Sequence, residues 1–230
     1  MAGETPNVPV QVTLTTLKII EFLHENGESG VSEIAGELGP SKSTIHNHLK
    51  TLYLRDYVDR EDGNYRLGFR FLDFAGGIQT RDPEFSHIHE KVREIADETG
   101  EISQFIVRDN SAAVILFIEK GDRAANTNIR VGQRIPPSTI VAGEVFADID
   151  DFTSGQNGGT PNYIVDDETF IEGLRSIAAP LVDTEDNLHG VLTITGPSHR
   201  FKNEKYENKI CDQLLNAISE LRLDVSYTRY

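Results

Sequence analysis

The sequence is poor in cysteine, tryptophan and long apolar runs. It has one cysteine, Cys211, and no tryptophan in 230 residues. A single cysteine excludes an internal disulfide and leaves no thiolate cluster for zinc or an iron–sulfur centre. The first residues are polar and contain proline, unlike a signal peptide, and no apolar run reaches membrane-spanning length. We therefore expect a cytoplasmic protein with no membrane contact, no metal site and no cofactor.

Positive charge is scarce as well, with 22 basic against 37 acidic residues and a formal net charge of −15. Such an excess of acid normally argues against nucleic acid, because DNA-binding proteins neutralise phosphates and release counterions. The acidity is spread along the chain, however, and arginine outnumbers lysine by 14 to 8. This pattern indicates a halophilic origin, where acidic surfaces stay solvated and salt screens distant charges. An ordinary acidic protein of a mesophile is the alternative.

Residues 41–70 depart from this acidity, with six basic against four acidic side chains. They overlap the most informative segment, which reads VSEIAGELGPSKSTIHNHLKTLYLRDYVDREDGNYRL from residue 31 to 67. Apolar residues recur at helical spacing on both sides of Gly39-Pro40, which predicts two helices joined by a tight turn. Ser41 is the expected N-cap of the second helix. Two short strands around Asp62-Gly63 predict a hairpin wing. The inner stripe of the second helix is expected at Ile45, Leu49, Leu52 and Leu54.

Polar side chains lie opposite that stripe, and they can donate hydrogen bonds to phosphates or base edges. The segment therefore predicts a winged helix-turn-helix that binds double-stranded DNA. The expected DNA-contacting residues are Ser41, Lys42, Ser43, Thr44, His46, Asn47 and Lys50 of the helix, with Arg60, Asn64 and Arg66 of the wing. A small helical domain with a polar surface and no DNA partner is the alternative.

The periodicity divides the chain into a DNA-binding domain at 8–68, a linker helix at 69–83 and a C-terminal domain at 84–230. The linker, FRFLDFAGGIQ from residue 69, is too apolar for a simple surface connection. We expect it to pack against its copy in a second chain, which gives a homodimer or homotetramer. Docking on its own domain is the alternative. Beyond it, helices over 85–99 and 203–223 flank hairpins over 102–119 and 177–195, an α+β layout.

The order of these parts, followed by GQRIPPSTIVAGEVFA, YIVDDETFIEGLRSIAAPLVD and GVLTITGPSHRF, resembles the IclR family of transcriptional regulators over almost the whole chain. The resemblance implies a GAF-like domain, an antiparallel sheet flanked by helices, that binds a small and often carboxylate-bearing metabolite. Occupancy of that site would change the affinity for DNA. Matched position by position, the resemblance implies an effector site at Val141, Ala142, Asp166, Ser176, Thr193 and Thr195.

Residues 148–162, DIDDFTSGQNGGTPN, are Gly-rich and shorter than the family's helical stretch. The shortening would leave the pocket open, shift it to another ligand, or leave a domain that only oligomerises and senses nothing. An enzyme is the competing class, but GxSxG, P-loop and HExxH motifs are absent. The pairs His46/His48 and His87/His89 are two residues apart on helices and so face different ways. We expect a metabolite-responsive regulator.

Overall fold

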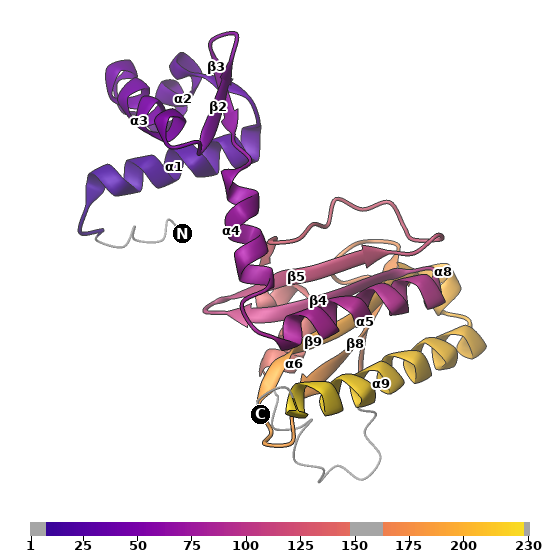
Figure 1. Ribbon diagram of the computed structural model, residues 1–230. Helices are drawn as coiled ribbons and strands as arrows, with labels where there is room; N and C mark the ends of the chain where they lie inside the picture. The colour runs from indigo at the N-terminus through magenta and orange to yellow at the C-terminus, as the bar shows by residue number, and fades with distance from the viewer. Residues whose placement is uncertain (1–7, 148–162, 228–230) are drawn as a thin grey trace. The chain divides into compact units, whose positions relative to one another are not determined.

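The computed structural model describes residues 8–147 and 163–227 (Figure 1). Its internal contacts divide the chain into two units, Met1–Ile78 and Gln79–Tyr230. The boundary falls within the segment for which we predicted a linker helix, and each unit is described by itself below. The segment that we interpreted as shortened, 148–162, lies outside the described residues.

In unit 1, three helices and a small antiparallel sheet surround one apolar core, and a fourth helix follows them. The elements of this unit are α1 (Gln11–Asn26), β1 (Ser29–Gly30), α2 (Val31–Leu38), α3 (Lys42–Leu54), β2 (Val58–Glu61), β3 (Asn64–Leu67) and α4 (Arg70–Gln79). The strand order is β1-β3-β2. The core gathers apolar residues from α1, α2 and α3, among them Ile19, Ile34, Ile45 and Leu49. This arrangement confirms the predicted helix-turn-helix and wing.

Local sequence explains the turns of unit 1. Gly39 ends α2 in the left-handed conformation at φ 92°, which a residue without a Cβ adopts at little cost. The Oγ atom of Ser41 accepts a hydrogen bond from the Thr44 amide at 3.2 Å, so the predicted N-cap is confirmed. Asp62 and Gly63 both have positive φ, as a two-residue hairpin turn requires. Leu54 was assigned wrongly: it is 67% exposed, because α3 ends there, beyond the core.

Unit 2 is a six-stranded antiparallel sheet with helices on both faces. In chain order it comprises α5 (Glu84–Thr99), β4 (Ile102–Asp109), β5 (Ala112–Lys120), β6 (Arg134–Ile135), η1 (Pro137–Thr139), α6 (Val141–Ala147), β7 (Ile164–Asp167), β8 (Leu174–Val182), β9 (Leu188–Pro197), α8 (Ser198–Phe201) and α9 (Glu204–Tyr227). The strand order is β6-β5-β4-β9-β8-β7. Both predicted hairpins and both predicted helices are present, which confirms the α+β class.

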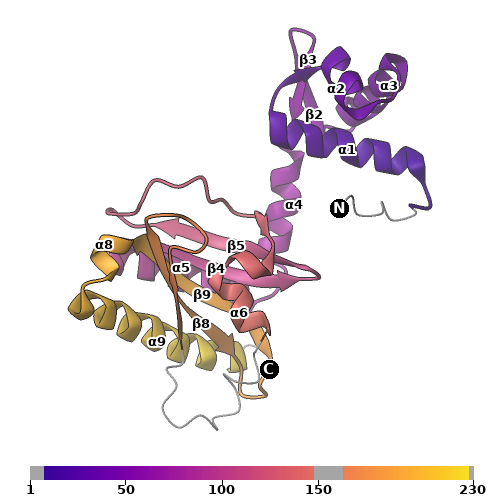
Figure 2. The same cartoon turned by 180° about the vertical axis from the view of Figure 1, so that it is seen from behind.

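The sheet separates two apolar layers. Helices α5 and α9 cover one face, and α6 lies against the other, as the front and back views show (Figures 1 and 2). Gly190 on β9 permits close packing within the first layer, since a Cβ there would come within 2.6 Å of the Phe105 ring. The α6 face is not fully closed, and this is where the cavity described below is located.

Candidate DNA interface and effector cavity

Helix α3 presents a polar face at the surface of unit 1. Ile45, Leu49 and Leu52 point into the core, and the side chains between them are exposed except for the half-buried His48. The hydroxyls at its start bond to one another, because Ser41 Oγ lies 3.0 Å from Ser43 Oγ and 2.8 Å from Thr44 Oγ1. These three hydroxyls therefore order the first turn of the helix as well as facing solvent.

Four longer side chains of α3 are free to reach a partner. Lys42, His46, Asn47 and Lys50 are exposed, and none of them makes a side-chain hydrogen bond to any residue that the structure describes. His48 differs, since its Nδ1 lies 2.8 Å from Thr16 Oγ1 and joins α3 to α1. The separate faces expected for His46 and His48 are thus present: the first faces solvent and the second is half-buried.

The wing carries its basic side chains on β2 and β3. Arg60 lies over the ring of Tyr65, with 5.5 Å between the guanidinium carbon and the ring centroid. Arg66 Nη1 is 3.0 Å from Glu61 Oε2 in an exposed ion pair. Asn64 is exposed at the start of β3. An exposed pair of this kind is worth little, about 0–1 kcal/mol, so Arg66 can exchange Glu61 for a phosphate at small cost.

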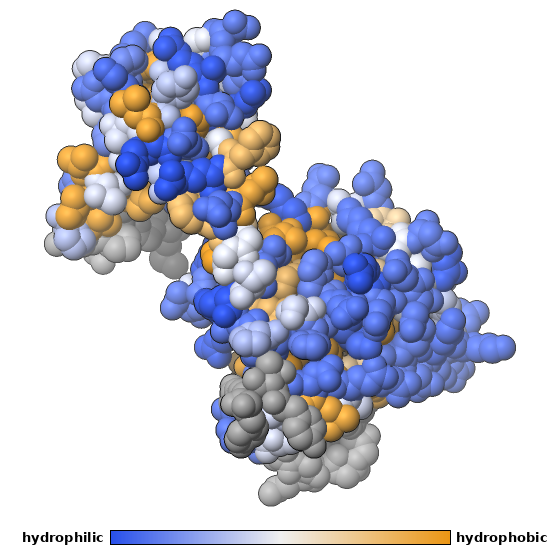
Figure 3. Space-filling view, viewed as in Figure 1, coloured by the Kyte–Doolittle hydropathy of each residue, from blue (hydrophilic) through white to orange (hydrophobic). Residues whose placement is uncertain are grey.

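Helix α4 leaves apolar side chains without cover in unit 1. Its first turns are held by Arg70, whose guanidinium carbon is 5.0 Å from the centroid of the Tyr57 ring, and by the stacking of Phe74 on Tyr57. Phe69 is nevertheless 82% exposed, and Leu72 and Ile78 are more than half exposed. Hydrophobic side chains are visible beside α4 and near the start of α1 (Figure 3). The α4 surface is unusually apolar for a helix end facing water.

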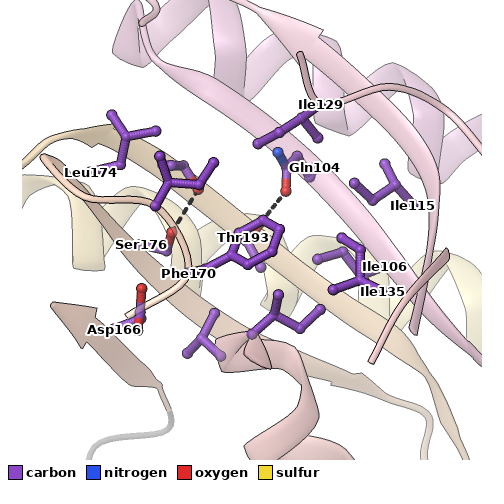
Figure 4. Close-up of a pocket in the computed structure, with 14 residues that line it drawn as sticks. Gln104, Ile106, Ile115, Ile129, Ile135, Asp166, Phe170, Leu174, Ser176 and Thr193 are labelled. Carbon is purple, nitrogen blue, oxygen red and sulfur yellow. Dashed lines mark hydrogen bonds between the residues drawn. The ribbon is translucent and has the colours of Figure 1, made fainter. Parts of the chain in front are cut away.

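In unit 2 a narrow cavity opens on the α6 face of the sheet, and the empty space among its walls, open solvent included, is about 450 Å³. Its walls are mainly apolar, with polar groups contributed by β4, β7, β8 and β9 (Figure 4). The described residues that line it are Gln104, Ile106, Ile115, Ile129, Ile135, Ile140, Val141, Asp166, Phe170, Ile171, Leu174, Ser176, Thr193 and Thr195. An apolar hollow with a few convergent polar groups is typical of a small-molecule site.

Five of the six residues that the sequence placed at an effector site line this cavity: Val141, Asp166, Ser176, Thr193 and Thr195. Ala142 does not line it. This residue is fully buried in the apolar layer beneath α6, because it follows Val141 by one position on the helix and so faces another way. Its role in binding an effector stays a prediction.

The strand register brings the polar groups together. Asp166 on β7 lies opposite Ser176 on β8, which in turn lies opposite Thr195 on β9. Ser176 Oγ and Thr195 Oγ1 are 2.9 Å apart. Two residues along β9, Thr193 Oγ1 donates to Gln104 Oε1 at 3.4 Å. Residues two apart on a strand share a face, so all of these groups face the cavity.

Two polar side chains of the cavity wall, Gln104 and Asp166, have hydrogen-bonding capacity that the described residues do not use. Gln104 is 5% exposed, and its Nε2 makes no hydrogen bond within the described residues. Asp166 is 6% exposed, and its carboxylate accepts no side-chain or backbone hydrogen bond from any residue that the structure describes. Buried polar groups are normally paired, because an unmade hydrogen bond costs about 1–3 kcal/mol. Both groups are thus available to a ligand.

The sequence analysis did not identify Gln104 or most of the apolar residues of the cavity wall. One signal was available: Gln104 lies among the apolar residues of the strand segment ISQFIV, where a buried polar side chain needs a partner. Phe170 and Ile129 come from segments between strands, and nothing in their spacing indicates a cavity. Among the described residues, no three histidine, cysteine or acidic side chains gather as a metal site would require.

Comparison with known proteins agrees with both units. Residues 15–60 match the family model for bacterial regulatory proteins of the arsR family. The whole chain is similar to the probable HTH-type transcriptional regulator ArcR of Halobacterium salinarum, at 22% identity over 93% of this chain and 94% of the relative. It is also similar to the transcriptional repressor IclR of Escherichia coli, at 24% identity over 85% of this chain and 83% of the relative.

Solved structures share the fold. The IclR crystal structure from Thermotoga maritima superposes with a TM-score of 0.76 at 20% identity and covers 94% of this chain and 99% of that chain. An IclR homologue from Microbacterium hydrocarbonoxydans, complexed with 4-hydroxybenzoate, gives a TM-score of 0.68 at 17% identity over 93% of this chain and 98% of that chain. These likenesses extend across both units.

A winged helix-turn-helix joined to an α+β unit with a lined cavity defines a class of DNA-binding transcriptional regulators. The curated relatives are regulators of this class and not enzymes. Over most of its length the chain is similar to curated transcriptional regulators that include IclR of Escherichia coli, and it shares the fold of solved IclR structures. No helix in the described residues is long and apolar enough to cross a membrane.

Proposed function

We propose that this regulator binds a small metabolite in the cavity of unit 2 and that occupancy changes its affinity for specific DNA. The observation that carries the proposal is the buried, unpaired Gln104 Nε2 in the cavity wall, in the same lining as Asp166, which is 6% exposed. A folded protein gains nothing from leaving such a group unpaired, whereas a ligand would supply its partner. The complex of the Microbacterium homologue with 4-hydroxybenzoate supports a ligand-binding role for this fold.

The DNA-binding part of the proposal rests on α3. Two copies would place their recognition helices in successive major grooves, about 34 Å apart, on a roughly palindromic operator. Lys42, Thr44, His46 and Asn47 would then reach base edges. Lys50, Arg60 and Arg66 would hold phosphates, which position the protein without reading sequence.

A matched pair of variants tests this division. Asn47→Ala should relax specificity at one base pair of the operator, at a cost of about 1–3 kcal/mol there. Lys50→Ala, which is exposed on the same helix, should weaken binding to operator and random DNA alike. Binding selections from a random library, made with each protein, measure both effects. Equal losses on both kinds of DNA for Asn47→Ala would refute the base-reading role.

The homodimer would form through α4 and cover the exposed side chains of Phe69, Leu72 and Ile78. Leu72→Ser and Ile78→Ser should convert dimer to monomer, as measured by light scattering in high salt. Glu25→Gln on α1 changes an exposed polar side chain away from this surface and is the control. A dimer that survives both α4 changes would show that α4 is not the contact.

The response to the ligand is tested by titrating DNA binding in the presence of candidate metabolites. A ligand shifts the DNA affinity only if it binds the two conformations of the protein unequally. A specific operator whose affinity changes with ligand supports the proposal. Specific DNA binding with no response to any compound that occupies the cavity would leave a regulator whose second unit serves oligomerisation alone.

A further inference from the structure

We infer that the effector of this protein is a small, largely apolar amine whose ammonium group binds Asp166, and not a carboxylate. The inference rests on the proposed effector-binding function and specifies the chemistry of the molecule bound. Its starting point is the electrostatics of the cavity, where a buried carboxylate meets no counter-charge.

Among the described residues that line the cavity, Asp166 alone has an ionisable side chain. No lysine, arginine or histidine of that lining would balance the charge of a bound carboxylate. A carboxylate placed near Asp166 would therefore meet like charge in a site with little water, where repulsion is strong. An ammonium group would instead find its counter-charge in place.

The acidic character continues beyond the cavity. Asp166 also borders a second hollow, formed by η1, α6 and the start of the segment after β7. The one other charged side chain among the described residues of that hollow is Glu144, and its remaining polar side chains are the hydroxyls of Ser138, Thr139 and Thr169. Glu144 thus adds negative charge on one side of Asp166, and this favours a cation at this position.

The rest of the wall indicates the shape of the ligand. Figure 4 places Asp166 and Gln104 on opposite sides of the cavity, with Phe170 and Thr193 between them. Gln104 Nε2 is a donor without a partner, so it requires an acceptor such as a phenol or carbonyl oxygen. Ile106, Ile135 and Phe170 offer apolar contact for the part between. An amine with an apolar or aromatic body and an acceptor at its far end would match all three features.

Three compounds that share one ring test the inference with the full-length protein. They are 4-hydroxybenzylamine, 4-hydroxybenzyl alcohol and 4-hydroxybenzoate, and calorimetry measures their affinities. We expect the amine to bind at least about tenfold more tightly than the carboxylate, since a charge-assisted hydrogen bond is worth about 1.5–3 kcal/mol. The alcohol should lie between them.

Two variants locate the preference. Asp166→Asn should abolish the advantage of the amine, whereas Asp167→Asn should leave it unchanged. Asp167 is the matched control, because it follows on the same strand, is exposed, and pairs with Lys202 at 3.4 Å outside the cavity. Gln104→Leu should weaken all three hydroxyl-bearing compounds by about tenfold without changing their order. The ranking of the three affinities is measured in the unmodified protein, so it does not depend on whether a variant folds well.

The outcomes separate the inference from the function on which it rests. If 4-hydroxybenzoate binds as tightly as the amine, or if the alcohol equals the amine, the charge of Asp166 contributes nothing and the inference is overturned. Effector binding would then still stand. If no amine, alcohol or acid of a wider panel binds in the cavity, both the inference and the proposed effector function fail.

Discussion

Asp183 organises the hairpin between β8 and β9, and its replacement by asparagine provides a quantitative test of the fold. The residue is 2% exposed. Its Oδ1 accepts hydrogen bonds from the amides of Glu185 and Asn187, both at 2.9 Å. Its Oδ2 is 3.2 Å from His189 Nε2, and the other ring nitrogen of His189 is 3.1 Å from Glu84 Oε1. One carboxylate thus joins the hairpin loop, β9 and the first turn of α5.

The magnitude follows from these bonds. Asp183→Asn keeps one carbonyl oxygen for the two amides, but it presents an NH₂ group where Oδ2 accepts from Asn187 Nδ2 and His189. Hydrogen bonds to a charged group contribute about 1.5–3 kcal/mol each, and the pair does not add fully. Because the loop residues Glu185 and Asn187 are exposed and solvent lies near, we take the lower part of that range. The expected loss is about 2 kcal/mol of unfolding free energy.

The assay is urea unfolding of the full chain over a range of pH in constant salt. Burial acts to raise the pKa of Asp183, but the hydrogen bonds from Asn187, His189 and the Glu185 amide outweigh it and hold the pKa well below its usual range. A group with a depressed pKa stabilises the fold above its unfolded-state value, about 3.9, and this stabilisation is lost as the pH falls through the folded-state value. The difference between the two proteins should therefore shrink below about pH 4. A difference under about 0.5 kcal/mol at neutral pH would refute the reasoning.

Four further substitutions test the packing and the helix positions, each by the shift of the urea midpoint. Phe105→Ala removes a fully buried ring from the layer beneath α5 and α9 and should cost about 3–5 kcal/mol. Gly190→Ala places a methyl group 2.6 Å from that same ring and should cost about 1–3 kcal/mol, whereas Gly36→Ala, with open space in α2, should stabilise by up to about 1 kcal/mol. Ser41→Ala removes the cap of α3 and should cost about 1 kcal/mol, with weaker operator binding; an unchanged midpoint would show that the cap contributes nothing.

Local signals in the sequence account for most of the fold. The cap at Ser41 and the turn at Asp62-Gly63 each depend on a few neighbouring residues, so spacing alone predicts them. The hairpins over β4–β5 and β8–β9 follow for the same reason. Leu54 shows the limit of periodicity: an apolar residue in the last turn of a helix keeps the spacing of the stripe but lies beyond the core that the stripe covers.

The cavity could be predicted only in part, because pairing between distant strands determines it. Ser176 and Thr195 meet through the register of β8 on β9, and the resemblance to a family was needed to select them. Gln104 belongs to the wall because β4 pairs on one side with β9, which is distant in the sequence, and on the other side with β5. No spacing rule predicts such a pairing, so the unpaired Gln104 Nε2 could be identified only from the structure.

The acidity of the chain and its binding of DNA are reconciled by where the charges lie. Helix α3 contains Lys42 and Lys50 and no acidic residue, although the net charge of the chain is −15. At about 1 M salt charges are screened within about 3 Å, so the carboxylates elsewhere barely oppose contacts made at hydrogen-bond distance. Buried charges are screened much less. Raising the salt concentration should therefore weaken DNA binding through the phosphate contacts of Lys50 and its neighbours, while the preference for an amine at the buried Asp166 should persist.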